Sequence, residues 1–212
     1  MKKALLATVM AFLVSSVGYA DELRLEAGAS AKVGDNTLSA TEQTRHDLSI
    51  SEDMVTKPAG YEHTEFAVSR SVTENIGLSL GVRNTNTEGT SSNRLQLDLN
   101  AGVGLPLGIG LANRLRLQME AGDDITAVTT DSLLLREKVT LSKTVALPFV
   151  SLDLSVGDEV FANEGGITEN RIEAAVTNEV CPGLSATAGY FRQMNTDGDD
   201  ANVVTVSAAL TF

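Results

Sequence analysis

The chain has 212 residues, of which 42% are hydrophobic and 21% charged, and its 28 acidic and 16 basic residues give a net charge of −12. This acidic balance disfavours nucleic-acid binding through phosphates. The single cysteine, Cys181, excludes an internal disulfide and a cysteine-based zinc site, and two histidines leave little scope for histidine-based metal chemistry. A mean hydropathy of +0.03 excludes a polytopic helical membrane protein, and the hydrophobic fraction excludes a wholly disordered chain.

The N-terminal segment has the features of a secretory signal peptide. Two lysines follow the first methionine, residues 4–14 are apolar apart from one threonine, and Gly18 and Ala20 stand where signal peptidase reads the chain. The apolar run is too short for a membrane anchor. Because Asp21 rather than a cysteine follows the expected cut, a lipoprotein is also disfavoured. We therefore expect a signal peptide over residues 1–20 and one domain over residues 21–212.

After residue 20, apolar and polar residues alternate with a period of two, which is typical of strands with two unlike faces. In the first such segment Leu23 and Leu25 share one face, and Arg24 and Glu26 share the other. About ten segments follow this pattern, and each is near the length of a tilted transmembrane strand. The segments cover residues 22–33, 65–72, 76–83, 94–103, 114–120, 133–142, 150–157, 171–177, 184–192 and 204–212.

The connections between these segments alternate between short turns and longer polar loops. Together these features predict an all-β fold, a closed antiparallel transmembrane β-barrel of about ten strands, with eight or twelve as alternatives. Twelve strands would result if residues 36–50 formed a hairpin inside the long first loop. If both termini are periplasmic, the strand number is even and the long loops face outward. The predicted short turns cover residues 73–75, 105–107, 143–148 and 181–183, and the predicted loops cover residues 34–60, 84–93, 122–131, 163–169 and 195–201.

A periplasmic β-sandwich or lipocalin-like barrel is the soluble alternative, with the apolar face inside. Tryptophan is absent and only 4% of residues are aromatic, which is little for such a core, although it is also little for the aromatic girdles of transmembrane barrels. Asn113 and Glu137 fall on the predicted lipid face, and a β-bulge or register shift would account for them.

The turn near Pro106 predicts a register for the two strands that flank it. Polar residues have even numbers on both strands, and residues that lie opposite each other must point to the same side of the sheet. The numbers of paired residues must therefore sum to an even value. A turn centred on Pro106 then places Asp98 opposite Arg114 and Gln96 opposite Arg116, all inside the barrel.

Several short motifs in the second half resemble a family of small Gram-negative outer-membrane barrels that is catalogued only as a domain of unknown function. The resemblance covers roughly residues 93–212, and the first half departs from it by lacking an early tryptophan. It implies an outer-membrane barrel and no activity. Phe212, which ends an alternating strand, resembles the signal that such barrels present to their assembly machinery. The motifs are Arg114-Leu115-Arg116, Pro148-Phe149-Val150-Ser151, Glu159-Val160-Phe161, Glu169-Asn170-Arg171 and Gly189-Tyr190.

Charged residues recur on the polar faces of the predicted strands and are expected to line the lumen. Ionisable groups inside a membrane-spanning structure are costly unless they are paired or hydrated. Since barrels of about eight strands are filled by their own side chains, we favour mutual neutralisation that plugs the lumen, over a narrow pore for small solutes. The predicted network comprises Arg24, Glu26, Arg83, Arg94, Asp98, Arg114, Arg116, Glu120, Arg136, Lys138, Asp153, Glu159, Arg171 and Glu173.

An enzymatic role has weaker support. His46 and Asp47, with Ser49 and Ser51, have residue types similar to those of outer-membrane lipases and acyltransferases, but they fall in a predicted loop. His63 is expected on the inward face of its strand. We therefore predict no catalytic residues, and keep a lipid hydrolase or acyltransferase with a loop or rim histidine as the alternative.

The acidic loop over residues 195–200 resembles a calcium loop only superficially, because its glycine is misplaced and no later glutamate follows. We predict no metal and no cofactor. The expected location is the outer membrane of a Gram-negative bacterium. The expected partners are its lipid and lipopolysaccharide, reached through divalent ions at the acidic loops, and the barrel-assembly machinery, reached through the C-terminal strand.

Overall fold

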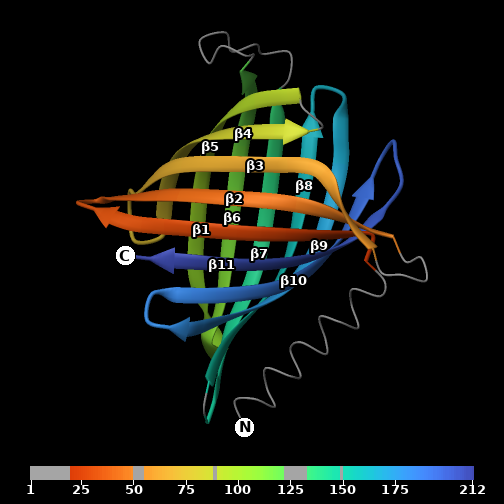
Figure 1. Cartoon of the computed structure of the whole chain (residues 1–212). Helices are drawn as coiled ribbons and strands as arrows, with labels where there is room; N and C mark the ends of the chain where they lie inside the picture. The colour runs from red at the N-terminus through yellow and green to blue at the C-terminus, as the bar shows by residue number, and fades with distance from the viewer. Residues whose placement is uncertain (1–19, 50–54, 88–89, 122–132, 149) are drawn as a thin grey trace.

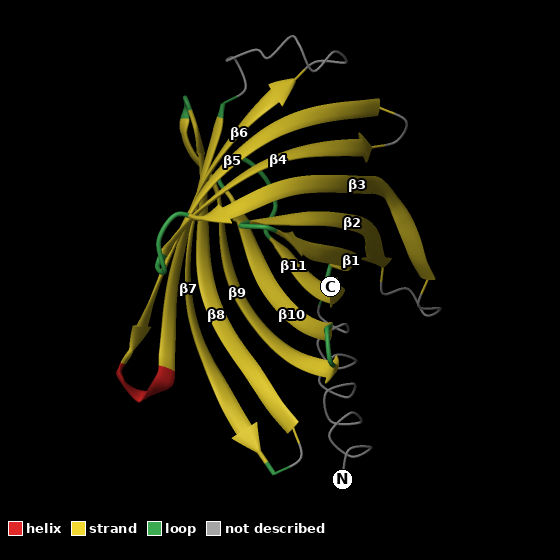
Figure 2. Ribbon diagram, turned by 90° about the vertical axis from the view of Figure 1, so that its left-hand side faces the viewer, coloured by secondary structure: helices red, strands yellow, loops and turns green. Residues whose placement is uncertain are grey.

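The computed structural model describes residues 20–49, 55–87, 90–121, 133–148 and 150–212, so the predicted signal peptide falls almost wholly outside the described residues. The described residues form eleven strands and one 3-10 turn, η1 (Pro106–Gly108). The strands close into one barrel, as Figures 1 and 2 show, which confirms the predicted all-β barrel. The strands are β1 (Glu22–Val33), β2 (Asn36–Ser49), β3 (Val55–Ser71), β4 (Ile76–Thr87), β5 (Thr90–Leu105), β6 (Ile109–Ala121), β7 (Leu134–Leu147), β8 (Val150–Asn163), β9 (Gly166–Cys181), β10 (Leu184–Asn195) and β11 (Ala201–Thr211).

Strand β2 is the one that the sequence analysis missed, because residues 34–60 were predicted as a loop. It pairs with the whole of β1, from Asn36 to Asp47, and Gly34, with a positive φ of 63°, makes the tight turn between them. The outward positions of β2 near one end hold Glu42, Thr44 and His46, so polar residues occupy both faces and the alternation disappears. Residues 36–49 form a single strand rather than the hairpin of the twelve-strand alternative.

The odd strand number makes the closing pair parallel. β1 and β11 run side by side in the same direction, from Glu22 opposite Val203 to Ser30 opposite Thr211, and every other neighbouring pair is antiparallel. The start of β1 and the end of β11 therefore lie at opposite ends of the barrel, so the condition given for an even strand number, both termini at one end, is not met. We call the end where β1 starts the loop end and the end where β11 finishes the turn end.

Strands extend into several of the predicted loops and turns. β4 and β5 leave only residues 88–89 between them, β8 and β9 leave only residues 164–165, and β7 continues to Leu147. The longest connection, between β6 and β7, lies at the loop end as the sequence predicts. Within the described residues, no helix is long and apolar enough to cross a bilayer.

The barrel has a polar interior and an apolar exterior. On β5, Gln96 and Asp98 face inward and are 1% and 7% exposed, whereas Leu97 between them faces outward and is 46% exposed. This is the opposite of the arrangement that the soluble alternative requires. The same outward, exposed placement is found for Leu25, Leu38, Phe66, Val68, Ile76, Leu78, Leu80, Leu99, Val103, Leu115, Leu135, Val139, Leu141, Leu154, Val156, Ile172, Val206 and Leu210.

Asn113 and Glu137 lie on this apolar exterior without any bulge in the pairing of β6 with β7, so the bulge or register shift proposed for them is wrong. Leu115 lies opposite Glu137, and Asn113 is the diagonal neighbour. The Asn113 Nδ2 donates a hydrogen bond of 3.0 Å to Glu137 Oε1. The two polar side chains therefore satisfy part of each other's hydrogen-bonding demand.

The register of β5 with β6 differs by two residues from the predicted one. Asp98 lies opposite Arg116 and not Arg114, and Gln96 lies opposite Gln118 and not Arg116. The numbers of paired residues sum to an even value, as predicted, but the turn is centred on Leu107 instead of Pro106. Proline, with φ fixed near −65°, suits the first position of a turn, and the residue after it takes the left-handed conformation, at a φ of 66°.

Candidate functional site

The inner wall of the barrel divides into two zones. Toward the loop end it carries long charged side chains, and we call this zone the charged half. Toward the turn end it is lined mostly by Gly, Ala, Ser and Thr, and we call this zone the small-residue half. The residues of the small-residue half include Gly28, Ser30, Ser39, Ala67, Ser69, Gly77, Ser79, Gly102, Gly104, Gly110, Ala112, Thr140, Ser142, Ser155, Ala175, Thr177, Ser185, Thr187, Ser207 and Ala209.

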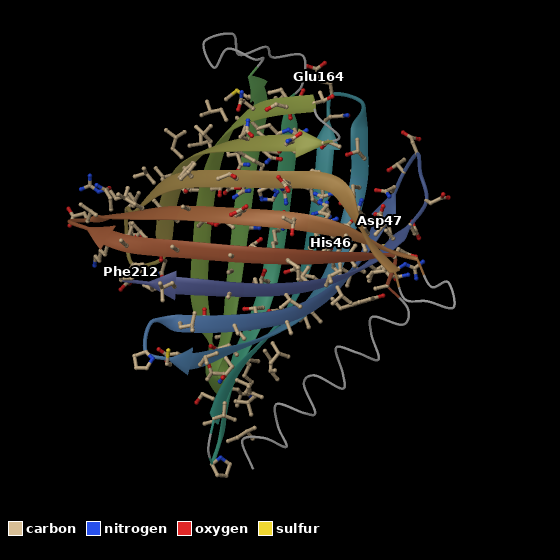
Figure 3. The ribbon with its side chains drawn as sticks, viewed as in Figure 1. His46, Asp47, Glu164 and Phe212 are labelled. Atoms are coloured by element: carbon tan, nitrogen blue, oxygen red, sulfur yellow. The ribbon has the colours of Figure 1, made fainter. Side chains whose placement is uncertain are left out.

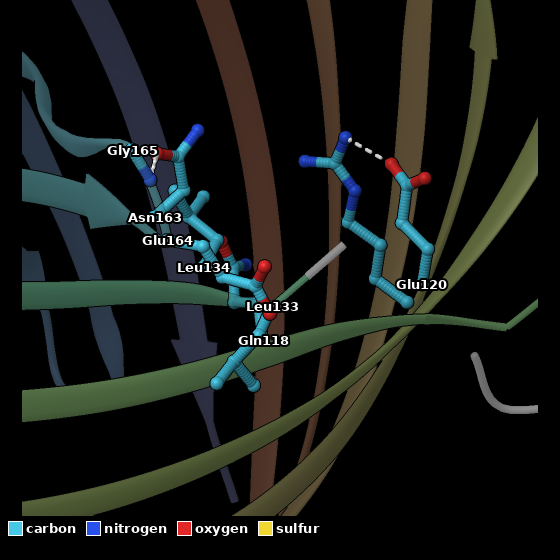
Figure 4. Close-up of a pocket in the computed structure, with 8 residues that line it drawn as sticks. Gln118, Glu120, Leu133, Leu134, Asn163, Glu164 and Gly165 are labelled. Atoms are coloured by element: carbon cyan, nitrogen blue, oxygen red, sulfur yellow. Dashed lines mark hydrogen bonds and ion pairs between the residues drawn. The ribbon is translucent and has the colours of Figure 1, made fainter. Parts of the chain in front are cut away.

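A cavity of about 530 Å³ lies in the charged half, and residues from every strand between β1 and β10 line it. A second cavity of about 430 Å³ lies nearer the loop end, against Asn163–Gly165 between β8 and β9 (Figure 4). The two cavities share Arg94, Gln118 and Leu134 as lining residues. They are therefore neighbouring parts of one polar interior.

A chain of ion pairs crosses the lumen between β3 and β6, which are not adjacent strands. Arg116 binds Asp98 through two hydrogen bonds of 2.7 Å, from Nε to Oδ1 and from Nη2 to Oδ2. The Arg116 Nη2 also lies 3.6 Å from Glu65 Oε1, and Glu65 Oε2 accepts a 2.7 Å hydrogen bond from Arg83. Bidentate guanidinium–carboxylate geometry of this kind is the strongest form of the interaction.

A second group of ion pairs is centred on Glu159 of β8. Its Oε1 accepts hydrogen bonds from Arg114 Nη2 at 2.7 Å and from Arg136 Nη2 at 2.9 Å, and the side chain is buried. Next to it, Lys138 Nζ lies 2.5 Å from Glu173 Oε1. One carboxylate therefore joins three neighbouring strands, β6, β7 and β8.

Guanidinium groups and aromatic rings alternate along the inner wall from β1 to β7. The Arg24 Cζ lies 4.7 Å from the ring centroid of Phe191, and the Arg171 Cζ lies 5.2 Å from the same ring. Arg171 and Arg136 each lie 4.4 Å from the ring of Phe161. Stacking on ring faces stabilises desolvated cations and holds the planar groups in place. This row of stacked arginine and phenylalanine side chains runs from β1 through β10, β9 and β8 to β7. It helps to fill the lumen on the side opposite the Arg116 ion pairs.

All fourteen residues of the predicted network lie on the inner face. Ten line the larger cavity, and of the others Asp98, Glu120 and Glu173 pair with residues that do. Asp153 lies apart, in the small-residue half, where it accepts a hydrogen bond from Thr144. The ten are Arg24, Glu26, Arg83, Arg94, Arg114, Arg116, Arg136, Lys138, Glu159 and Arg171.

Four residues that form ion pairs in the charged half, Glu22, Arg45, Glu65 and Glu169, are missing from the predicted network. Glu22 pairs with Arg24 and lies 3.6 Å from Arg45, and Glu169 pairs with Arg171. Arg45 was missed because β2 was not predicted. Glu65 could have been found, because it is the first residue of the predicted segment 65–72 and has the same parity as His63, which was expected to face inward.

The histidines do not assemble with the residues proposed beside them. On β2, His46 faces outward opposite Leu23 and lies 3.4 Å from Thr44 Oγ1, whereas Asp47 faces inward opposite Glu22 (Figure 3). Ser49 ends the strand, and Ser51 lies outside the described residues. Within the described part of the chain, no group of three His, Cys, Asp or Glu residues could hold a metal ion.

The other histidine is part of the inner wall. His63 is 5% exposed, lines the larger cavity and has its Nδ1 3.3 Å from the Tyr61 hydroxyl oxygen. The same Tyr61 ring lies 3.6 Å from the Arg45 Cζ. His63 therefore belongs to the packed charged half, as its predicted inward orientation implied.

The C-terminal residue Phe212 follows β11 at the turn end, where its backbone N–H donates to Ser30 O at 2.9 Å (Figure 3). Its side chain is exposed, as is Cys181 at the end of β9.

Comparison with known proteins places the chain in a family. No curated protein matches it. A family model described as a protein of unknown function matches residues 25–204, which cover β1 to the first part of β11. The match includes the first half of the chain, beyond the region to which the sequence resemblance was assigned. The chain thus belongs to the protein family of unknown function DUF2490.

Proposed function

We propose that the protein is a non-catalytic outer-membrane β-barrel whose lumen is closed by its own ion pairs. The observation that carries the proposal is the reversed polarity of the wall, with exposed leucine, valine and isoleucine outside and paired charges inside. Soluble monomers rarely expose continuous apolar surface of this extent. A closed sheet with an apolar exterior also meets the requirement that no backbone edge be left unpaired in lipid.

In the proposed orientation, the turn end and Phe212 face the periplasm and the loop end faces outward. Short turns on the periplasmic side are the rule for barrels of this kind. The acidic loop over residues 195–200 would then meet lipopolysaccharide phosphates through divalent ions, and the C-terminal strand would meet the assembly machinery. In this orientation the first residues of β1 would lie at the outer end of the barrel, because β1 runs parallel to β11.

The closed lumen follows from the ion pairs that cross it. The links from Arg116 to Glu65 and from Arg114 to Glu159 join strands that are not adjacent, so side chains bridge the interior rather than only coat it. A small-solute pore is the second candidate, and the small-residue half favours it because Gly, Ala and Ser leave that end wide. The geometry disfavours a lipid-modifying enzyme, because His46 and Asp47 face opposite sides of β2.

Planar-bilayer recording separates the plug from the pore. We expect the folded barrel to give no stepwise current, because closing the lumen requires only the ion pairs already formed. Each sample should first show heat-modifiable migration on a detergent gel, unboiled against boiled, so that a lack of current is not due to unfolded protein. Reproducible stepwise currents from such a sample would contradict the closed lumen and support the pore.

A further inference from the structure

We propose that the outer face of β2 and β3 is the contact surface between two copies of this chain in the membrane. This contact rests on the proposed function, because it forms within a bilayer, but it does not depend on whether the lumen is open or closed. Three features of the face carry it. The apolar belt is short on these two strands, polar residues border it on both sides, and the polar residues of the two strands complement each other.

The apolar belt is much shorter on β2 and β3 than on the strands beside them. Where β2 pairs with β3 before the register shift, its apolar outward residues are Leu38 and Ala40, which lie opposite Val68 and Phe66. By contrast, β1 and β5 each carry six consecutive apolar residues on the outer face, and β4 carries four. At a rise of about 3.3 Å per residue and a tilt of about 40°, two outward positions cover roughly 10 Å of depth and six cover roughly 30 Å. The apolar band of a membrane barrel is about 25 Å tall, so β2 and β3 do not match it.

Polar residues border the short belt on both sides. Toward the loop end Glu42 lies opposite Thr64, and both face outward. Toward the turn end Asn36 lies opposite Arg70, which forms an ion pair of 3.3 Å with Asp35. A bilayer of ordinary thickness would bring hydrocarbon against at least one of these borders, where charged groups are costly. A protein partner removes this cost, because it offers hydrogen-bond donors and acceptors at the same depth.

The face has the layout of a protein interface, an apolar centre with a polar rim. Within the centre Phe66 protrudes most, since it is 61% exposed against 44% for Leu38 and 47% for Val68. A protruding aromatic side chain is the type of residue that contributes most to binding when it is buried at the middle of an interface.

The occupant that fits the loop-end border is a second copy, because the outward residues of β2 and β3 are complementary there. A carboxylate lies opposite a hydroxyl in both outward pairs, Glu42 with Thr64 and Glu62 with Thr44. A two-fold axis along the bilayer normal, passing between β2 and β3, sets β2 of one copy against β3 of the other at equal depth. Carboxylates of one copy then meet hydroxyl donors of the other.

The turn-end border is complementary to itself in the same way. Arg70 and Asp35 carry opposite charges side by side, and their side chains are 63% and 82% exposed. The same two-fold axis brings two such ion pairs together, so that each guanidinium group gains a second carboxylate. Both borders of the face therefore favour a second copy over lipid.

Cysteine cross-linking in lipid vesicles tests the contact, with the folded barrel in a Cys181→Ser background. Val68→Cys, which lies in the apolar centre of the face, should give a covalent dimer on oxidation. The matched control is Val156→Cys, on the outer face of β8 at the other side of the barrel, where the valine is 54% exposed. The control should stay monomeric.

Two tryptophan variants test the contact without a thiol. Ala40→Trp adds a bulky apolar side chain that lipid accommodates and a packed contact does not, so the association constant of the dimer should fall at least tenfold. Ala101→Trp makes the same change on the outer face of β5 and should leave the dimer unchanged. Energy transfer between labelled copies in vesicles measures the dimer fraction, and heat-modifiable migration shows that each variant is folded.

A covalent dimer of Val68→Cys, with a dimer that Ala40→Trp weakens and Ala101→Trp does not, supports the inference. A heat-modifiable, vesicle-inserted barrel that stays monomeric overturns it and leaves the proposed function intact, and so does a dimer that Ala40→Trp leaves unchanged. If that monomer is more stable in lipids with shorter acyl chains, the bilayer thins beside β2 and β3 instead. A barrel that does not insert into vesicles overturns the proposed function itself.

Discussion

Asp98→Asn is expected to lower the free energy of unfolding by about 3 kcal/mol or more, because removing one partner of a buried ion pair leaves the other charge uncompensated. Arg116 is one-tenth exposed or less and makes both of its shortest hydrogen bonds to Asp98. Its remaining contact with Glu65, at 3.6 Å, is too long to replace them. Urea unfolding of the barrel in lipid vesicles, followed by circular dichroism, measures the change.

The control for this prediction is Asp200→Asn, which breaks an ion pair with Arg192 that is about half exposed. Solvent screening limits such pairs to about 1 kcal/mol or less. The double variant Asp98→Leu with Arg116→Leu should cost less than Asp98→Asn alone, because it leaves no unpaired charge. Equal, small losses for Asp98→Asn and Asp200→Asn would show that the lumen is hydrated enough to screen its charges.

Cysteines at positions 27 and 208 are expected to form a disulfide across the closing pair of strands. Ala27 and Ala208 are pairing partners on the outer face of β1 and β11, and neighbouring strands lie about 4.8 Å apart, within disulfide range. The variant is Ala27→Cys with Ala208→Cys in a Cys181→Ser background. Closing a loop of about 180 residues should stabilise the barrel by up to about 5 kcal/mol on a chain-entropy model.

Non-reducing gels of boiled samples and urea unfolding with and without reductant measure this effect. The matched control, Ala27→Cys with Ala186→Cys, places the second thiol on β10, with β11 in between, and should not cross-link. Cross-linking of the control pair instead of the first pair would contradict the parallel closure. It would mean that β1 pairs directly with β10.

The sequence suffices to predict the architecture because the faces of most strands are chemically unlike. Leu95, Leu97 and Leu99 alternate with Gln96 and Asp98, and this pattern alone places the charges inside once the exterior is assigned to lipid. The same reasoning fails for β2, whose outward Glu42, Thr44 and His46 carry no apolar signal. Because β2 was missing from the prediction, the predicted even number of strands and the predicted antiparallel pairing of the first and last strands were both wrong.

Ion-pair partners are less accessible to sequence reasoning than the face on which a residue lies. The pairing of Asp98 with Arg116 depends on a turn centred one residue beyond Pro106, and the contact of Arg116 with Glu65 depends on the curvature that brings β3 and β6 together. Neither leaves a periodic signal. The alternation of residues along a strand limits the possible ion-pair partners to one face of the sheet. Only the register between strands decides which of them lie opposite each other.

Fluorescence quenching of single cysteines tests directly whether hydrocarbon surrounds the apolar face of the barrel. In a Cys181→Ser background, an environment-sensitive dye is attached in turn at Leu97, Leu117 and Leu154 on the exterior and at Ser142 on the inner wall. We expect quenchers carried on lipid chains to act on the three exterior sites and not on the inner one. Exterior sites that no lipid-borne quencher reaches but that aqueous iodide does, in a folded and vesicle-inserted barrel, would contradict it.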